Sequence, residues 1–197
     1  IRSLNELTNN KYASLEPVFT AIQTGLEEIL SKRRPIPEVD LVLPLSQVTK
    51  EMADVVGAKM ANVGELRNKV PGLTVPDGFV MTVAAYELFL AHNQLPDEIN
   101  RRIQSMELED MATIYRLSSE IQMLIINAEM PPALAEAMHH AYENLARNLG
   151  DRVTVSLRSS AIGEDSQNVS FAGQYRSELN VSPDNLLTVY KEILASK

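Results

Sequence analysis

Apolar residues recur near the start of the chain with the spacing of an amphipathic helix. Across residues 12–33 an apolar side chain stands at every third or fourth position, which predicts a helix with one apolar face. These positions are Leu15, Val18, Phe19, Ile22, Leu26, Ile29 and Leu30. Such a face needs a partner surface, on this domain, on another chain or on an upstream domain. The proline-punctuated segment RPIPEVDLVLP follows, so we expect residues 1–40 to form a helical extension and a linker.

The rest of the chain mixes short strand patterns with helical ones. We expect strands near residues 43–45, at 78–82, at 153–158 and near 175–181. Helices are predicted at 58–68, at 84–93, from Pro96 onward, at 110–127, from 131 to 149 and after Pro183. The terminal helix carries an apolar stripe that faces either a missing lobe or this domain's own core. The stripe consists of Leu186, Leu187, Tyr190 and Ile193.

Candidate chemistry is concentrated after the strand pattern VTVSLR, residues 153–158. Arg158 ends this strand, and a loop rich in small and polar residues follows it. The loop includes Ser159, Ser160, Gly163 and, in a second small-residue turn, Gly173. Small residues let backbone N–H groups approach an anion closely. The pattern is therefore typical of a site that grips phosphate.

Three motifs, in the same order along the chain, resemble one family. The string RSSAIGEDSQNVSFAGQY at 158–175 closely resembles a loop in the N-terminal nucleotide-binding domain of phosphoenolpyruvate synthase, pyruvate phosphate dikinase and their relatives, including rifampicin phosphotransferases. The string VGAKMANVGEL at 56–66 looks like the opening motif of that domain. The string GLTVPDGFVMT at 72–82 is similar to the turn and strand that follow it. Together the three are far more specific than any one alone.

The resemblance implies an α/β fold, with residues 41–197 forming the first part of an ATP-grasp-like domain that includes a helical insertion. In that family, the lysine and the arginine of these motifs contact the phosphates of ATP, so Lys59 and Arg158 are the expected catalytic and ATP-binding residues. The matching positions of the small-residue loop are Gly173 and Ser177, and we expect Ser159 and Ser160 to bind ATP as well. Mg²⁺ is implied, but its ligands are expected beyond residue 197, so no metal ligand is predicted in this chain.

The resemblance also implies a larger enzyme. ATP would pass a phosphoryl group to a histidine on a mobile domain and from there to pyruvate, so the expected partners are ATP and the downstream phosphohistidine and pyruvate-handling domains. None of His92, His139 and His140 lies in a phosphohistidine motif, so this chain alone is expected to be inactive. Two alternatives remain: a rifampicin- or glucan-type dikinase with the same front end, and a non-catalytic ATP-sensing or scaffold module. A homo-oligomer is left open.

Composition narrows the choice of partners. The chain has 18 basic and 26 acidic residues, a net charge of −8, which argues against binding to nucleic acid or to an anionic membrane. The absence of cysteine excludes a disulfide scaffold, a thiolate zinc site and a cysteine nucleophile, and fits a cytoplasmic protein. No run of about 18 apolar residues is present.

Simpler interpretations compete at the site. Lys59 could be a solvated helix residue, and Arg158 could form a surface ion pair with Glu164 or Asp165. The chain also departs from the family pattern at two positions. Ala58 replaces a glycine usually seen before the lysine, and Arg176 stands where many relatives carry an acidic residue. The charge of Arg176 could lie near the phosphates or point to solvent.

Overall fold

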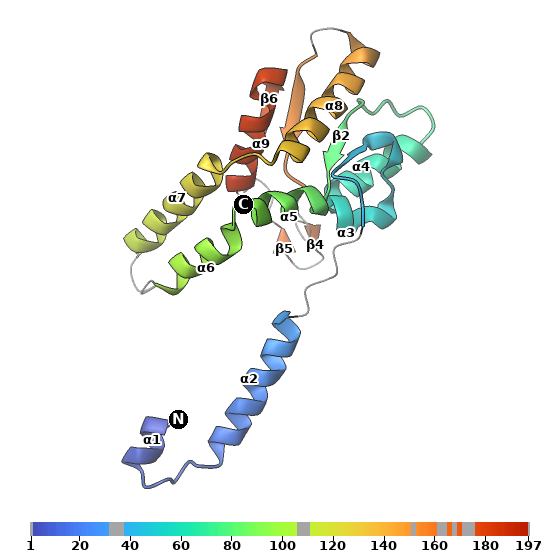
Figure 1. The fold of residues 1–197 in the computed structure, drawn as a ribbon. Coiled ribbons are helices and arrows are strands. Elements are labelled where there is room, and N and C mark those ends of the chain that lie inside the picture. The colour runs from blue at the N-terminus through green and yellow to red at the C-terminus, as the bar shows by residue number, and fades with distance from the viewer. Residues whose placement is uncertain are drawn as a thin grey trace. The chain divides into compact units, whose positions relative to one another are not determined.

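The computed structural model describes residues 2–31, 38–105, 111–150, 153–160, 165–166, 169–170 and 176–196. The chain divides into two compact units, Ile1–Ile36 and Pro37–Lys197. The first unit consists of helix α1, Arg2–Leu7, and helix α2, Leu15–Ser31 (Figure 1). Between them the Oδ1 atom of Asn5 accepts the Tyr12 N–H at 3.0 Å, which fixes the turn that separates the two helices.

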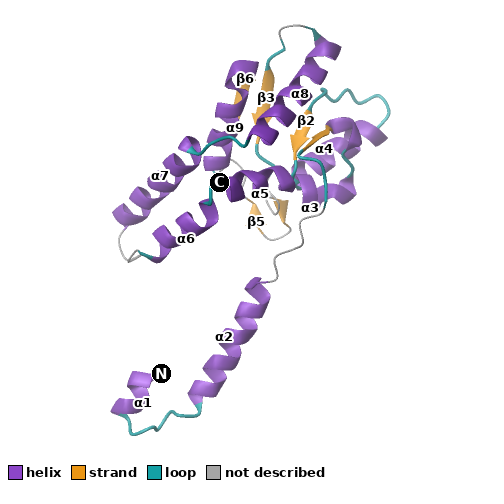
Figure 2. Cartoon of the chain, in the orientation of Figure 1, coloured by secondary structure: helices purple, strands orange, loops and turns teal. Residues whose placement is uncertain are grey.

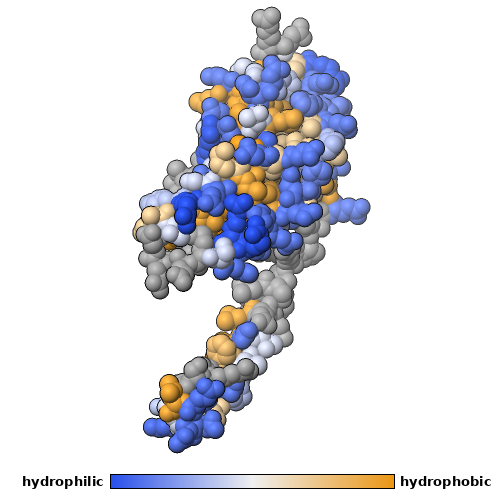
Figure 3. Space-filling model, turned by 60° about the vertical axis from the view of Figure 1, so that its left-hand side comes forward, coloured by the Kyte–Doolittle hydropathy of each residue, from blue (hydrophilic) through white to orange (hydrophobic). Residues whose placement is uncertain are grey.

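The amphipathic helix predicted at 12–33 is confirmed as α2. Its apolar side chains that the structure describes are exposed, with exposed fractions between 45% and 57%. They are Leu15, Val18, Phe19, Ile22 and Leu26. The side chains of Ile29 and Leu30 lie outside the described residues. Figure 3 shows apolar side chains at the surface of this unit beside hydrophilic ones.

The second unit contains short antiparallel strand pairs among helices (Figure 2). Strand β1, Val42–Pro44, pairs with β2, Phe79–Met81. Strand β3, Val155–Arg158, pairs with β6, Ser177–Val181, and β4, Asp165–Ser166, pairs with β5, Val169–Ser170. The strands predicted near 43–45, 78–82, 153–158 and 175–181 are confirmed within one or two residues. Along β3 the side chains alternate between half-buried and exposed, as the period of two in VTVSLR predicts.

The predicted helices are also confirmed, with small shifts at their ends. They are α4 Ala58–Lys69, α5 Val83–His92, α6 Leu95–Gln104, α7 Met111–Asn127, α8 Pro132–Leu149 and α9 Leu186–Ala195. Shorter turns of helix lie at η1 Leu45–Gln47, η2 Lys50–Met52, α3 Ala53–Val56 and η3 Pro183–Asn185. Gly150 ends α8 with a φ of 113°, a conformation that favours glycine over any residue with a side chain.

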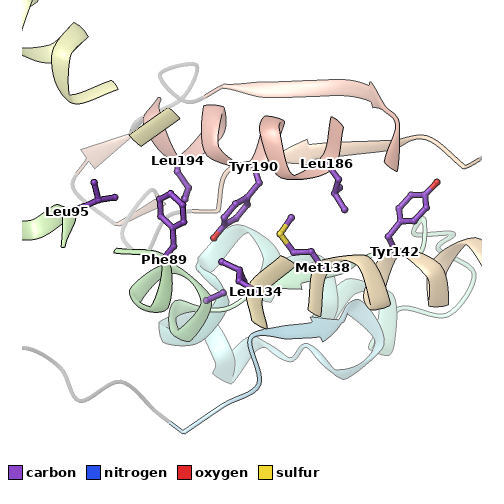
Figure 4. Packing of buried hydrophobic residues seen from close by; sticks show 9 residues of the cluster. Phe89, Leu95, Leu134, Met138, Tyr142, Leu186, Tyr190 and Leu194 are labelled. Carbon is purple, nitrogen blue, oxygen red and sulfur yellow. The ribbon is translucent and has the colours of Figure 1, made fainter. Parts of the chain in front are cut away.

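The largest core cluster lies where α5, α8 and α9 meet (Figure 4). At its centre, the rings of Phe89 and Tyr190 pack edge to face, with centroids 6.4 Å apart and an interplanar angle of 85°. Burial among these side chains raises the pKa of the Tyr190 phenol well above its ordinary value. The cluster consists of Ala85, Phe89, Leu95, Leu134, Met138, Tyr142, Leu186, Tyr190 and Leu194.

Helix α9 has apolar side chains on two of its sides, and each of these sides packs against other elements of the domain. Leu186, Tyr190 and Leu194 belong to the cluster with α5 and α8, while Val189 and Ile193 pack with the β3–β6 pair. The stripe predicted for the terminal helix therefore faces this domain's own core, and a missing lobe is not needed to bury it.

A second cluster joins the β1–β2 pair to α4. It consists of Leu43, Leu45, Val48, Val56, Ala61 and Val80. The neighbours Val42, Phe79 and Met81 pack against the first cluster instead, so the two faces of this strand pair serve different cores. Since Ala61 lies one turn into α4, this second cluster fixes the helix that carries Lys59.

Candidate functional site

Helix α4 is held along its length by the segment before it. The Nδ2 atom of Asn68 donates to the carbonyls of Ser46 and Val48 at 3.2 and 3.0 Å. The backbone at Gly64 lies so close to Val48 that a Cβ atom there would be 2.4 Å from the Val48 carbonyl oxygen. Only glycine permits this approach. The helix is therefore fixed in position, and Lys59, its second residue, projects from a rigid support.

The N-terminus of α4 meets the residues that follow β3. The Ser160 hydroxyl accepts the Met60 N–H at 3.2 Å and donates to the Val56 carbonyl at 2.8 Å. The Nζ atom of Lys59 donates to the carbonyl of Ser159 at 3.4 Å, and Ser159 is buried. Two of the three sequence motifs, 100 residues apart along the chain, thus adjoin in space. We call Lys59, Arg158, Ser159 and Ser160 the motif junction.

Arg158 and Ser177 are cross-strand partners in the β3–β6 pair. Residues directly opposite one another in an antiparallel pair project to the same face, so both side chains lie on one side of this ribbon. Both are exposed. Among the acidic side chains that the structure describes, none forms an ion pair with Arg158. The alternative partners Glu164 and Asp165 have side chains outside the described residues, so that interpretation stays a hypothesis.

Five of the six predicted site residues therefore lie in two adjoining groups. Lys59, Ser159 and Ser160 are in contact across the two motifs, and Arg158 and Ser177 pair on neighbouring strands. The sixth, Gly173, lies outside the described residues. The hydroxyl of Ser160 is bonded to α3 and α4, a role that the sequence did not predict.

Gly57 makes a close contact that the sequence did not predict either. It separates α3 from α4 with a φ of 80°, and a Cβ atom there would lie 2.3 Å from the Ser160 carbonyl oxygen. The only sequence signal is a glycine immediately before the lysine helix. Glycine is needed at this position both for the backbone conformation and for the approach of the two motifs.

Replacing Gly57 by alanine should therefore destabilise the domain more than the backbone conformation alone explains. Gly72 is a control matched in φ, which is 82°, and nothing lies within 4 Å of the position that a Cβ atom would take there. We expect Gly72→Ala to cost about 1 kcal/mol, and Gly57→Ala to cost at least about 1 kcal/mol more, because the junction must open. Urea unfolding of both variants measures the difference. Equal losses would contradict the close packing of Gly57 on Ser160.

Arg176 does not contribute a free charge to the junction. Its Nη2 atom lies 3.1 Å from the Glu178 carboxylate and 3.0 Å from that of Glu192, and the backbone N–H of Arg176 donates to the Ser196 hydroxyl at 3.2 Å. Two carboxylates compensate the guanidinium, which connects β6 to α9. The Arg176 side chain is 46% exposed, so this departure from the family pattern forms a surface ion-pair bridge within the domain. Its proximity to the phosphates stays a hypothesis.

A separate groove lies between α6 and α7, away from the predicted site residues. It is lined by, among others, Leu95, Arg102, Arg116, Glu120, Met123 and Leu124. Its arginines are already paired, Arg102 with Glu98 and Glu120, and Arg116 with Glu120. Hydrogen bonds from Arg101 and Arg102 lower the pKa of Glu98. Compensated arginines are a poor match for a polyanion, so we do not place the predicted phosphate site in this groove.

Neither a candidate metal-binding cluster nor a membrane-spanning helix is found in the part of the chain that the structure describes. No group of three or more histidine, aspartate or glutamate side chains is placed to hold a metal ion among these residues. None of the helices described here is both long enough and apolar enough to cross a membrane.

The combination of helices and small sheets around this junction is consistent with an α/β nucleotide-binding domain. Residues 53–197 match the family described as pyruvate phosphate dikinase, AMP/ATP-binding domain. The chain therefore belongs to that family, and the resemblance drawn from the three motifs is confirmed.

Curated relatives agree with this assignment. The phosphoenolpyruvate synthase of Aquifex aeolicus is 38% identical over 160 residues, which cover 79% of this chain and 19% of the relative. The probable phosphoenolpyruvate synthase of Staphylothermus marinus is 34% identical over 163 residues, covering 81% and 19%. The phosphoenolpyruvate synthase of Escherichia coli is 31% identical over 159 residues, covering 79% and 20%. The chain thus spans about a fifth of the length of these three relatives.

Proposed function

We propose that this chain binds ATP through its phosphates at the motif junction, as the first part of an ATP-grasp-like domain. The observation that carries the proposal is the contact between the two motifs, in which Lys59 meets Ser159 beside Arg158. Membership of an AMP/ATP-binding family supports a nucleotide as the ligand. The contact supports the junction as the place where the phosphates lie.

The chemistry of the junction suits a polyanion. Lys59 supplies a compact positive charge, and Arg158 supplies a planar fork that can hold two phosphate oxygens at once. Helix α4 adds the positive end of its dipole, because Lys59 lies in its first turn. The proposal thus places these positive groups at the ligand in a chain whose net charge is −8.

The parent protein would be a phosphotransferase resembling phosphoenolpyruvate synthase. Phosphoryl transfer depends mainly on positioning and charge stabilisation, which Lys59 and Arg158 would provide. The loop that ends at Ser177, and that includes Gly173, would close over the phosphates and exclude water. The acceptor would be a histidine on another domain, which then passes the group to pyruvate. The names of the relatives favour this acceptor over an antibiotic or a glucan. We expect a cytoplasmic enzyme.

Mg²⁺ would neutralise phosphate charge when bound. We expect its ligands to lie beyond residue 197. No step of the proposal depends on a metal held by this chain.

A calorimetric titration tests the proposal. The chain is titrated with ATP in the presence of Mg²⁺ and, in parallel, with adenosine. We expect saturable binding of one ATP per chain and much weaker binding of adenosine, because the phosphates carry the interaction. If ATP fails to bind both to this chain and to one extended through the rest of the domain, the proposal is wrong.

A further inference from the structure

We infer that Ser160 is a positioning residue that caps helix α4 from a distant part of the chain and thereby sets the place of Lys59. This inference deepens the proposed function and rests on it. The family resemblance pointed to Ser160 as an ATP ligand, whereas its contacts assign the hydroxyl to the helix that carries the lysine.

The hydroxyl of Ser160 is bonded on both its donor and its acceptor side. A serine hydroxyl has one hydrogen to donate, and Ser160 donates it to the Val56 carbonyl at 2.8 Å. It accepts the Met60 N–H at 3.2 Å, which leaves one lone pair. A phosphate oxygen is an acceptor and needs a donor. Ser160 has no second hydrogen to offer it, so binding to phosphate would break the bond to Val56.

These bonds perform the task of a helix cap. The first N–H groups of a helix lack partners within the helix, and a side-chain oxygen normally supplied by the preceding residue satisfies one of them. The residue before α4 is Gly57, which has no side chain to supply it. Ser160 provides that oxygen to Met60, the third residue of α4, from a point 100 residues further along the chain.

The same contacts fix the distance between the lysine and β3. Lys59 immediately precedes Met60, and its Nζ atom reaches the carbonyl of Ser159, the neighbour of Ser160. The bare backbone of Gly57 lies against the Ser160 carbonyl and allows this close approach. Removing the Ser160 hydroxyl therefore removes two of the hydrogen bonds that hold α3 and the first turn of α4 to the residues after β3.

A double-mutant cycle tests whether Ser160 acts through Lys59. ATP affinity is measured for the wild-type chain, Ser160→Ala, Lys59→Ala and the double variant, each checked for folding by circular dichroism. We expect Ser160→Ala to weaken ATP binding about tenfold in the wild-type background and less than about twofold in the Lys59→Ala background. Ser119→Ala is the matched control, because among the described residues that hydroxyl bonds the Tyr115 carbonyl of its own helix. It should leave ATP affinity unchanged.

Amide hydrogen exchange supplies a readout without nucleotide. In Ser160→Ala the Met60 amide should exchange at least about tenfold faster, whereas the Ala61 amide, which bonds the Gly57 carbonyl within the helix, should change less. Unchanged exchange at Met60 would overturn the inference. An equal loss of ATP affinity in both backgrounds would also overturn it, because Ser160 would then contact the nucleotide itself.

The double-mutant cycle and the exchange experiment together separate this inference from the proposed function. If the wild-type chain and its extended form do not bind ATP, the proposed function fails, and so does the part of the inference that concerns phosphate. The exchange experiment still decides whether Ser160 caps α4. If ATP binds and Met60 is protected by Ser160, but the cycle shows no coupling to Lys59, the proposed function stands and the positioning role is wrong.

Discussion

Replacing Lys59 by alanine is expected to weaken ATP binding by about ten- to a hundredfold, the range that loss of one or two hydrogen bonds to a charged group produces. The Nζ atom of Lys59 already lies at the end of β3, 3.4 Å from the Ser159 carbonyl, so a small change of rotamer would bring it to a phosphate beside Arg158. Titration calorimetry with ATP measures the loss. Adenosine binding should change little, because the lysine would contact only phosphate.

Two further variants make this result specific. Lys69, at the other end of α4, is exposed and paired with Glu65 at 2.7 Å, so Lys69→Ala should leave ATP affinity unchanged. Arg158→Lys keeps the charge but loses the planar fork, and we expect it to bind ATP more weakly than the wild-type chain. If Lys59→Ala and Lys69→Ala bound ATP equally well, the lysine of the opening motif would not be the phosphate ligand.

The largest effect on stability is expected at Phe89. This side chain has no exposed surface and packs edge to face on Tyr190 at the centre of the cluster that joins α5, α8 and α9. Phe89→Ala should lower the free energy of unfolding by about 3–5 kcal/mol, through lost burial and the cavity that remains. Urea denaturation measures the change, and Phe89→Leu, with an expected smaller loss, gives a value should the alanine variant not fold.

Phe19 is the matched control for Phe89. Its side chain on α2 is 54% exposed, so Phe19→Ala should change the free energy of unfolding by no more than about 0.5 kcal/mol. A loss at Phe19 as large as that at Phe89 would mean that the apolar face of α2 is covered in solution. The contrast between the two variants therefore also tests the exposure of that face.

Much of the fold could be predicted from the sequence because its signals are local. The prolines at 131 and 132 and the glycine at 150 mark the ends of α8, and the alternation in VTVSLR marks β3. The burial of α9 on two sides was harder to predict. A stripe of apolar residues shows which side chains are buried but does not identify the surface that covers them. The contacts of Leu186 and Ile193 were needed to show that the stripe faces the core of this domain.

The site was predicted as a set of residues but not as an arrangement. The motifs singled out Lys59 and Arg158, and their roles stay predictions. The cap that Ser160 places on α4 depends on a contact over 100 residues of sequence, which no local pattern encodes. The pairing of Arg176 with Glu178 and Glu192 likewise depends on the packing of α9 against β6.

The central claim is that the phosphates of ATP lie beside Lys59. An acyl-phosphate derivative of ATP, which acylates lysine amines near its phosphates, tests this directly when the modified peptides are mapped by mass spectrometry. We predict preferential labelling of Lys59 that excess ATP suppresses and that the Lys59→Ala variant lacks. ATP-protected labelling at Lys69 or Lys191, with none at Lys59, would contradict the account.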